Sequence, residues 1–328
     1  MHAPRVPKLS VVVPVYRGAD TVTELVERLS EELRPSYDFE IVLVEDCSPD
    51  NSRAVMQGLA ARHPWVVCVH LSRNFGEHNA VLCGLNYATG DYVVTMDDDL
   101  QNPPSEVTRL VKELEAGFDV VYSRYDRKRH HWFRNLGSKL NDRVANVMLG
   151  KPPDLYLSSF KAMSRFVVDE IIKFDGPFPY IDGLILRTTR NIKVVTVEHH
   201  QRAVGASGYT LTKLVRLWVN MFTSFSILPL RVASLFGLLV AAAGVLAAIA
   251  FAVERVRNPS LPLGWASLSV MVLLLAGVQL FALGMLGEYL GRMFLKLGGE
   301  PQFVVRETLN SPKRAGNKSR VEPVASQV

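Results

Sequence analysis

The first two hundred residues alternate short runs of apolar, largely β-branched residues with longer segments whose apolar residues recur at helical spacing. Such runs are typical of buried strands, and the segments between them of amphipathic helices. Strand and helix in regular alternation predict an α/β fold, with a mostly parallel sheet covered by helices on both faces. The predicted strands are 9–16, 39–46, 65–72, 91–97 and 118–123, and the predicted helices are 20–34, 51–62, 77–88 and 104–117.

The pattern changes near residue 230, where two long runs without a charged residue follow each other. Val232–Val253 comprises 22 such residues, and Pro259–Gly287 forms the second run. A helix needs about 20 apolar residues to cross a ~30 Å hydrocarbon core, so we expect membrane-spanning helices at about 232–253 and 263–287. Two buried helices of a soluble protein are the alternative. The short connector predicts a hairpin whose two flanks lie on the same side of the bilayer.

The distribution of lysine and arginine predicts which side that is. Arg255 and Arg257 lie in the connector, whereas eight basic residues lie near the outer ends of the two runs: Lys213, Arg216, Arg231, Arg292, Lys296, Arg306, Lys313 and Arg314. Basic residues concentrate on the cytoplasmic side, so the N-terminal part and both termini are expected in the cytoplasm, on the inner membrane. The first apolar stretch is too short for a signal peptide.

Four regions are therefore expected: an α/β domain (1–205), an interfacial amphipathic helix (206–230), the hairpin (231–290) and a cytoplasmic tail (291–328). In the second region, apolar residues such as Leu211 and Trp218 share one side of a helix, with Lys213 and Arg216 on another. That arrangement is typical of a helix lying in the membrane interface. The polar end of the tail, from about Thr308, is expected to be disordered.

Composition narrows the class of protein. The 328 residues are 48% hydrophobic and 21% charged, which excludes a disordered or fibrous chain. The three cysteines, Cys47, Cys68 and Cys83, have neither a disulfide-framework nor a zinc-site spacing. The net charge of +5 is modest, and no nucleic-acid partner is expected.

Polar residues that the sheet itself does not need follow three predicted strands, where ligands of such sheets bind. These segments are Pro14–Arg17, Glu45–Asp50 and Asp97–Pro104. Three consecutive carboxylates repel one another, and a cation held by Asp97 and Asp99 and shared with phosphate oxygens would relieve this repulsion. Oxygen ligands favour Mg²⁺ or Mn²⁺. The alternative is a solvated acidic turn. Asp50, just before a predicted helix, is expected to be an N-cap.

These segments, together with LSRNFGEHNAVLCGL and DDDLQNPP and the two long runs, resemble family-2 glycosyltransferases that load a sugar onto polyprenyl phosphate. The chain is similar to the dolichyl-phosphate mannose synthases and to bacterial undecaprenyl-phosphate transferases of glucose or aminoarabinose. The similarity covers residues 9 to about 305 and implies a GT-A fold for the first domain. By this resemblance the enzyme is also expected to form homo-oligomers, namely tetramers.

The resemblance also implies roles for the residues at the strand ends. Pro14, Tyr16 and Asp46 are expected to hold the nucleotide, with Glu45 where many relatives have a second Asp. Asp97, Asp99 and Gln101 are expected to bind the metal and the diphosphate, and Asp98 to have a lesser nucleotide contact. Arg73 and Asn74 are expected near the nucleotide, although a purely structural turn at Asn74 is nearly as compatible with the sequence.

Basic residues further along the chain suit the acceptor phosphate. Arg134 and Ser138 share one helical face, and Arg124 follows a strand; guanidinium and hydroxyl groups are good ligands for a phosphate oxyanion. A solvated basic face is the competing interpretation, and it accounts well for Arg127–Arg129. By resemblance, Arg202 belongs to a loop that closes over the diphosphate, with Gly205 and Gly208 as its hinges.

The expected reaction is a single inverting displacement in which the lipid phosphate attacks the anomeric carbon of a nucleotide sugar. Asp154, the nearest candidate for a base, is spaced differently from relatives, and an ionised phosphate hardly needs one. The expected substrates are a UDP-hexose and undecaprenyl phosphate, with GDP-mannose or an aminoarabinose nucleotide as alternative donors. A processive polysaccharide synthase would have more spans, and an inert scaffold would not need the intact acidic and basic positions.

Overall fold

The computed structural model describes residues 6–125, 155–176, 178–198, 228–257, 264–298 and 301–311. The chain divides into two units. The first comprises Met1–Gly208 together with Pro301–Val328, and the second comprises Tyr209–Glu300.

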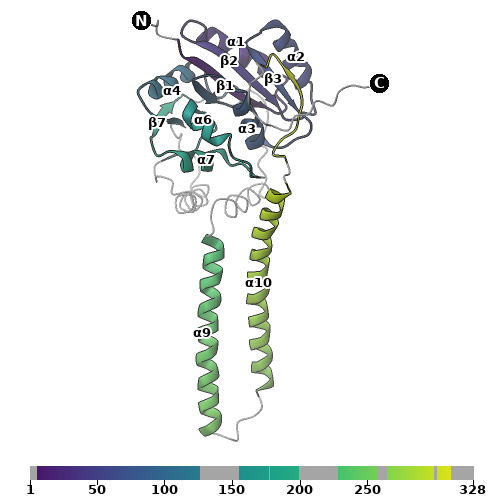
Figure 1. Ribbon diagram of the computed structural model, residues 1–328, viewed down its shortest axis with the longest axis vertical. Helices are drawn as coiled ribbons and strands as arrows, with labels where there is room; N and C mark the ends of the chain where they lie inside the picture. Colours follow the sequence, from purple (N-terminus) through teal and green to yellow (C-terminus); the bar gives the residue numbers. More distant parts are fainter. Residues whose placement is uncertain are drawn as a thin grey trace, which may run out of the picture. The chain divides into compact units, whose positions relative to one another are not determined.

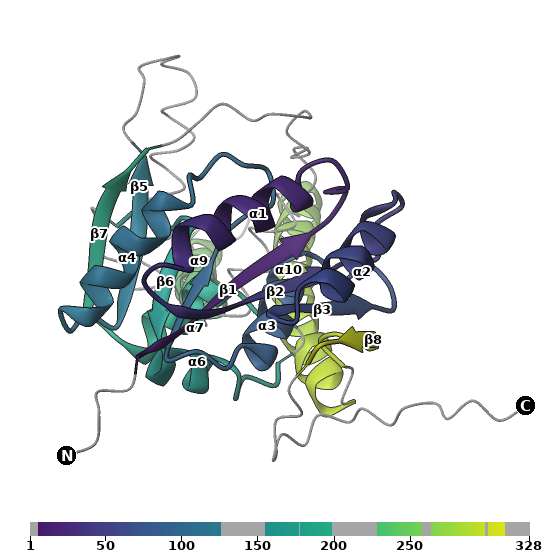
Figure 2. The ribbon, with the colours of Figure 1, turned by 90° about the horizontal axis from the view of Figure 1, so that it is seen from above.

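An eight-stranded mixed sheet forms the centre of the first unit, in the order β7-β5-β6-β4-β1-β2-β3-β8 (Figures 1 and 2). β4, β1, β2 and β3 run parallel to one another, as do β5 and β7, whereas β6 and β8 are antiparallel to their neighbours. The expected α/β class and its five strands are confirmed. The strands are β1 (Lys8–Val15), β2 (Asp38–Glu45), β3 (Val66–Leu71), β4 (Tyr92–Thr95), β5 (Val120–Tyr125), β6 (Lys161–Ser164), β7 (Ile192–Val197) and β8 (Val305–Leu309).

Helices cover both faces of this sheet, as Figure 2 shows. α1 (Val22–Leu33), α2 (Ser52–Arg62) and α4 (Ser105–Glu115) lie on one face, and α3 (Glu77–Tyr87), α6 (Arg165–Ile171) and α7 (Ile181–Thr188) on the other. The core of the first face is fully buried, with Leu25, Met56 and Leu110 packed on Val13 and Leu43. Burial of these apolar side chains is the main stabilising contribution to the fold.

On the opposite face α3 approaches the sheet closely. A Cβ atom at Gly84 would lie 2.3 Å from Val12 Cγ1 and 3.1 Å from Val44 Cγ2. Only glycine fits between the helix and two β-branched residues at this distance. The close packing holds the second half of α3 against β1 and β2.

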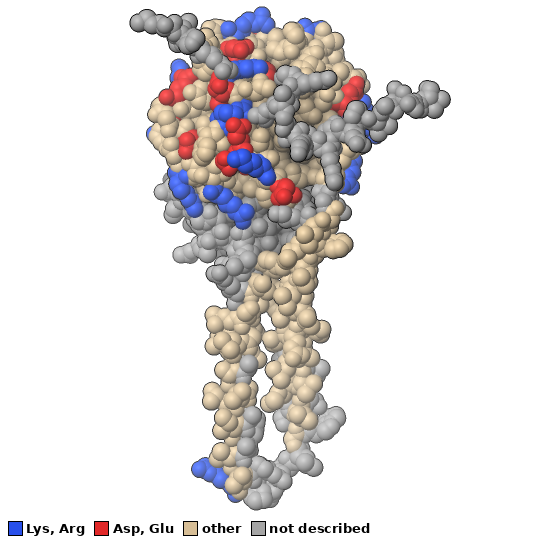
Figure 3. Space-filling view, viewed as in Figure 1, with Lys and Arg blue, Asp and Glu red and all other residues tan. Residues whose placement is uncertain are grey.

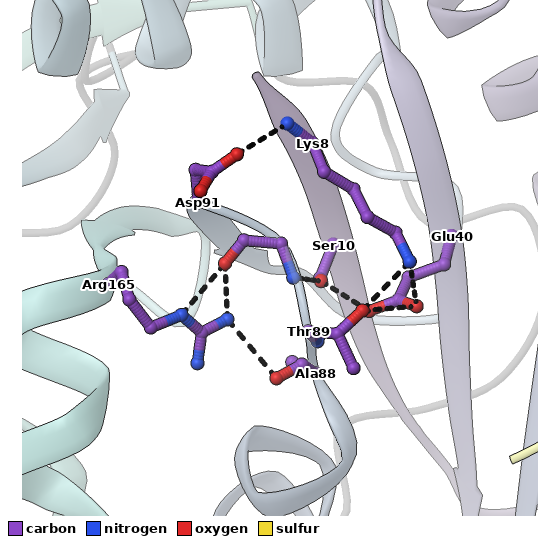
Figure 4. Close-up of polar contacts among 8 residues, drawn as sticks. Lys8, Ser10, Glu40, Ala88, Thr89, Asp91 and Arg165 are labelled. Carbon is purple, nitrogen blue, oxygen red and sulfur yellow. Dashed lines mark hydrogen bonds and ion pairs between the residues drawn. The ribbon is translucent and has the colours of Figure 1, made fainter. Parts of the chain in front are cut away.

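A polar network ties together the amino-terminal edge of the sheet (Figure 4). The buried Glu40 carboxylate accepts hydrogen bonds from Lys8 Nζ (2.8 Å), Ser10 Oγ (2.6 Å) and the backbone N–H of Thr89 (2.6 Å). The Arg165 guanidinium donates from α6 to the carbonyl oxygens of Gly90 and Ala88. This network joins β1, β2, the loop before β4, and α6.

The chain after the second unit returns to the first as a strand. β8 pairs with β3, so Thr308 and Leu309 complete an edge strand rather than beginning the polar tail. Asn310 then adopts a left-handed φ of 56° and donates from Nδ2 to the carbonyl oxygen of Ala60 (2.7 Å). The last residues described, up to Ser311, are therefore part of the folded domain.

The second unit contains two long helices, α9 (Leu228–Arg257) and α10 (Trp265–Leu297), which lie side by side (Figure 1). Large apolar side chains along both are more than half exposed, among them Leu238 (66%), Leu246 (68%) and Phe281 (64%). In Figure 3 the visible surface of the two helices carries few charged side chains along most of its length. Judged on the described residues alone, no helix is long and apolar enough to cross a membrane.

Candidate functional site

The loops that follow β1, β2 and β4 lie at one edge of the sheet, because these three neighbouring strands are parallel. Each loop contains a residue with a left-handed backbone: Arg17 (φ 61°), Cys47 (φ 50°) and Leu100 (φ 60°). Among the described residues, only Asn310 is a further non-glycine residue of this kind. Such conformations cost free energy and concentrate at functional sites, so the strained loops identify this edge as the candidate site.

Asp46 connects the end of β2 to the loop after β3. Its two carboxylate oxygens accept hydrogen bonds from the backbone N–H groups of Phe75 (2.7 Å) and Gly76 (2.8 Å), and Asn74 Nδ2 donates to its carbonyl oxygen (3.2 Å). Burial raises the pKa of Asp46, and the two backbone donors only partly offset this effect. The structural-turn interpretation of Asn74 therefore has direct support, while Arg73 is exposed and stacks on the Phe75 ring.

The Glu45 carboxylate is turned inward rather than toward the edge. It is 3% exposed, Oε1 accepts the backbone N–H of Ser48, and Oε2 lies 3.4 Å from His70 Nδ1. Ser48 Oγ in turn accepts the backbone N–H of Arg17 (2.9 Å), which joins the loops after β1 and β2. Glu45 thus stabilises the loops from behind.

The neighbouring loops contain three further residues that the sequence indicated, namely Asp50, Tyr16 and Pro14. Asp50 Oδ1 accepts from Ser52 Oγ (2.6 Å) and Ser52 N (3.3 Å), where α2 begins, although Asn51 occupies the N-cap position itself. Tyr16 is 47% exposed, with the Arg17 guanidinium over its ring. Pro14, at the end of β1, is half-buried.

The acidic turn after β4 holds its three carboxylates in different environments. Asp97 Oδ2 accepts a hydrogen bond from Ser159 Oγ (2.6 Å), and the buried Asp99 accepts one from the backbone N–H of Gln101 (3.2 Å). Asp98 points toward Gly18, where a Cβ atom would lie 2.1 Å from its Oδ2.

Asp98 is the most perturbed carboxyl group of the turn. Burial, followed by the charges of Asp97 and Asp99, raises its pKa to about 7, although backbone N–H groups donate to it. Its Oδ2 is buried without a hydrogen-bond partner. The family resemblance implied a lesser role for Asp98 than for its neighbours, and a linear pattern does not reveal its environment.

The donor set at this turn fits a divalent cation in part. Within the described part of the chain, no group of three His, Cys, Asp or Glu side chains could hold a metal ion. Asp97 and Asp99 nevertheless offer two carboxylates beside the crowded and incompletely hydrogen-bonded Asp98. A cation shared with ligand oxygens would lower this electrostatic cost, which is the chemistry expected of hard oxygen ligands.

A second buried cluster was not predicted from the sequence. Lys161 on β6 forms an ion pair with Asp182 in the first turn of α7, and Tyr122 Oη donates to the same carboxylate (2.8 Å). The only sequence signal was a single Asp among apolar residues at 181–186, and the partner strand lay too far away to be assigned.

Of the remaining predicted site residues, the structure describes only Arg124. Arg124 is exposed at the end of β5. Arg134, Ser138 and Arg202 lie outside the described residues, as do Asp154 and the two hinge glycines.

Comparisons with known proteins show which family the chain belongs to. The sequence profile of "Glycosyl transferase family 2" matches residues 10–172. The undecaprenyl-phosphate 4-deoxy-4-formamido-L-arabinose transferase of Proteus mirabilis (strain HI4320) is 32% identical over 96% of this chain and 98% of its own length. The enzyme of that name from Enterobacter sp. (strain 638) is 33% identical over 92% and 94%.

A likeness to a solved structure concerns the fold alone. The glucosyl-3-phosphoglycerate synthase of Mycobacterium tuberculosis, crystallised with Mn²⁺, UDP and phosphoglyceric acid, superposes with a TM-score of 0.50 at 20% identity. The match covers 66% of this chain and 76% of that one. The chain belongs to glycosyl transferase family 2 and is a glycosyltransferase.

Proposed function

We propose that this enzyme transfers a sugar from a nucleotide sugar to undecaprenyl phosphate at the cytoplasmic face of the membrane. The observation that carries the proposal is the near full-length similarity to two transferases named for that acceptor. The strained edge of the sheet, with its acidic turn, supplies a site of the right chemistry.

For the donor we propose a nucleotide carrying 4-deoxy-4-formamido-L-arabinose. Both named relatives act on this sugar, which favours the aminoarabinose alternative over the UDP-hexose expected first. UDP is proposed as the nucleotide, with Tyr16, Asp46 and Asp98 lining its site. The Tyr16 backbone N–H donates to the Asp98 carboxyl, and the Tyr16 ring is exposed and suited to stack on a base.

Mg²⁺ or Mn²⁺ is proposed at Asp97 and Asp99, with Gln101 as an additional ligand. When bound, such an ion would neutralise charge on the diphosphate leaving group. Ser159 holds Asp97 in place through its hydroxyl, and the backbone N–H of Gln101 does so for Asp99. The fold neighbour that contains Mn²⁺ and UDP supports a divalent cation in a fold of this kind.

The protein's part in the displacement is to position two anions. Arg124, Arg134 and Ser138 are proposed to hold the acceptor phosphate in line with the anomeric carbon, since guanidinium groups donate paired hydrogen bonds to phosphate. Arg202 is proposed to close over the diphosphate. The phosphate oxygen attacks as the bond to the diphosphate breaks, which inverts the anomeric configuration.

We also propose that α9 and α10 form a membrane hairpin, within the four regions 1–205, 206–230, 231–290 and 291–328. No helix qualifies as a span on the described residues alone. The support is the full uncharged sequence of the two runs, which extends beyond those residues, and the exposure of large apolar side chains along both helices. Exposed apolar surface of this extent requires an apolar environment. A homo-oligomer, as expected from the resemblance, belongs to the same proposal.

The proposal is tested by release of nucleoside diphosphate from UDP-, GDP- and dTDP-sugars, with polyprenyl phosphate and Mg²⁺ or Mn²⁺ each present or omitted. Turnover of the UDP-linked formamidoarabinose that needs both lipid and metal is the expected result. Turnover of another sugar alone would overturn the donor assignment. A folded protein that turns over no donor would favour the inert scaffold.

The acceptor site is tested separately with Arg134→Ala and, as a matched control, Arg129→Ala. Loss of a phosphate ligand raises KM for the lipid more than KM for the donor, and the control changes neither. Equal effects of Arg134→Ala on both KM values would show that Arg134 is not an acceptor ligand.

A further inference from the structure

A row of three polar residues crosses the sheet beneath the candidate site. Glu45 on β2 is the register partner of His70 on β3, which is the partner of Glu307 on β8. Register partners point to the same face of a sheet, so the three side chains lie on one face. The row runs from the edge strand that follows α10 to the end of β2.

His70 is the anomalous member of this row. The side chain is fully buried, and neither ring nitrogen has a hydrogen-bond partner; Nδ1 lies 3.4 Å from Glu45 Oε2. Buried polar groups are nearly always hydrogen-bonded, so an imidazole in this state needs an explanation. A core position with no other task would be occupied at lower cost by an apolar residue.

On the outer side, Glu307 of β8 lies beside His70 as its register partner. Glu307 Oε2 accepts hydrogen bonds from Arg53 Nη2 (2.6 Å) and Gln57 Nε2 (3.3 Å) of α2. The pairing of β3 with β8 is irregular between His70 and Leu71. Glu307 is thus fixed by α2 at the position next to His70.

On the inner side, the row continues into the loops of the candidate site. Glu45 Oε1 accepts the backbone N–H of Ser48, and Ser48 Oγ accepts the backbone N–H of Arg17. Arg17 and Cys47 are two of the left-handed residues of this edge, so these loops need external support to keep their conformation. Glu45 provides it only while its own carboxylate is held in place.

We propose that His70 is a positioning residue for the donor site. Flanked by Glu307 of β8, it holds the Glu45 carboxylate in place, and Glu45 in turn holds the loops containing Tyr16 and Cys47. This inference rests on the proposed function only in calling those loops the donor site. It assigns β8 a second role besides completing the sheet, since the strand that returns from the second unit then supports the conformation of the nucleotide-binding loops.

The test compares His70→Phe, which keeps an aromatic ring but removes the nitrogens, with His63→Phe as a matched control. His63 is an imidazole near the opposite end of β3, where it lies against Trp65. In the full-length enzyme, amide hydrogen exchange at Ser48 is expected to accelerate about tenfold in His70→Phe and to stay unchanged in the control. An unchanged Ser48 amide overturns the proposal, whether or not the protein turns over any donor.

Binding of UDP and steady-state kinetics give the second readout. The Kd for UDP and KM for the donor are expected to rise about tenfold in His70→Phe, with kcat and the lipid KM nearly unchanged. His70→Gln, whose amide can donate to Glu45, is expected to recover most of the loss. A lower Tm without any change in KM or Ser48 exchange would indicate a merely structural residue.

Glu307→Gln tests the same row of residues if His70→Phe folds poorly. The amide retains an oxygen for Arg53, so a smaller effect in the same direction is expected, and no effect on Ser48 would count against the role of β8. If wild-type enzyme binds no UDP, the proposed function fails, while Ser48 exchange still decides the role of His70.

Discussion

A buried carboxyl group, Glu40, and a half-buried one, Asp98, lie at opposite edges of the same sheet and have their pKa shifted in opposite directions. At the amino-terminal edge, burial by itself would raise the pKa of Glu40, but donors from Lys8, Ser10 and Thr89 outweigh it and lower the pKa. At the carboxyl-terminal edge, burial and two neighbouring carboxylates raise the pKa of Asp98 to about 7. The first edge is arranged for its own stability, whereas the second is left electrostatically incomplete, as expected where a ligand completes the site.

The largest effect is expected when the incomplete edge loses a metal-binding candidate. Asp99→Ala should reduce sugar transfer by about 10³-fold or more, because charge on the leaving diphosphate would no longer be neutralised. Folding and membrane insertion should be retained. Transfer assays alongside circular-dichroism melting check both, and an Asp99→Ala enzyme with near-normal turnover would remove the metal assignment.

Glu40→Gln tests the amino-terminal edge, where donors surround the buried carboxylate. The substitution replaces a charged acceptor with a neutral amide whose NH₂ must face either Lys8 Nζ, at the position of Oε2, or the backbone N–H of Thr89, at the position of Oε1 (Figure 4). One donor then meets another donor, so the free energy of unfolding should fall by about 2–4 kcal/mol. Activity per folded molecule should not change. Denaturation in detergent measures the loss, and a stable Glu40→Gln protein would contradict the contrast between the edges.

The pH dependence of the same variant gives an independent check. A carboxyl group whose pKa is lowered on folding stabilises the protein above its ordinary pKa of 4.5 and loses that contribution as the pH falls through the folded value. The difference in free energy of unfolding between wild type and Glu40→Gln should therefore be largest near pH 7 and should decrease below about pH 4.5.

Asp98→Asn should change the free energy of unfolding in the opposite direction from Glu40→Gln. With the pKa of Asp98 raised, ionisation opposes folding, and the penalty is full above about pH 7 and disappears below the ordinary value of 3.8. Without divalent ions at pH 8, the variant should be more stable than wild type by about 1–2 kcal/mol, a figure reduced for partial exposure. Unfolding with chelator at pH 8 and pH 4 measures this, and a destabilised variant at pH 8 would show that the carboxylate is satisfied.

Local pattern was sufficient for the central part of the fold. Five β-branched runs gave five strands, and the acidic turn Asp97–Asp99 was placed at the correct edge, because parallel neighbours end together. β6, β7 and β8 were missed. They are no shorter than the predicted β4, but each has a lysine or arginine among its few residues, whereas β4 is uncharged. β8 also lies in a charged segment, Val305–Leu309, whose strand character depends on pairing with a partner more than 230 residues away.

Within the site, sequence indicated which residue types gather but not where they point. The inward turn of Glu45 depends on Ser48 and His70, and the pair of Lys161 and Asp182 depends on antiparallel register between β5 and β6. Register across distant strands is a property of the assembled sheet and leaves no linear signal. The raised pKa of Asp98 is of the same kind, because it requires the close approach of Gly18.

The smallest effect is expected at an exposed pair, which separates burial from ion pairing as such. Glu24 and Arg28 form an ion pair one helical turn apart on α1, with side chains about half exposed, 48% and 55%. Exposed pairs of this spacing contribute about 0.3–0.5 kcal/mol and are screened by salt, so Glu24→Gln should change the free energy of unfolding by less than about 0.5 kcal/mol. Glu24→Gln and Glu40→Gln are the same substitution at an exposed and at a buried glutamate. The two sites differ mainly in desolvation and in the number of hydrogen-bond donors. A loss at Glu24 as large as that at Glu40 would mean that charge neutralisation in general destabilises this chain, and that the amino-terminal edge has no special role.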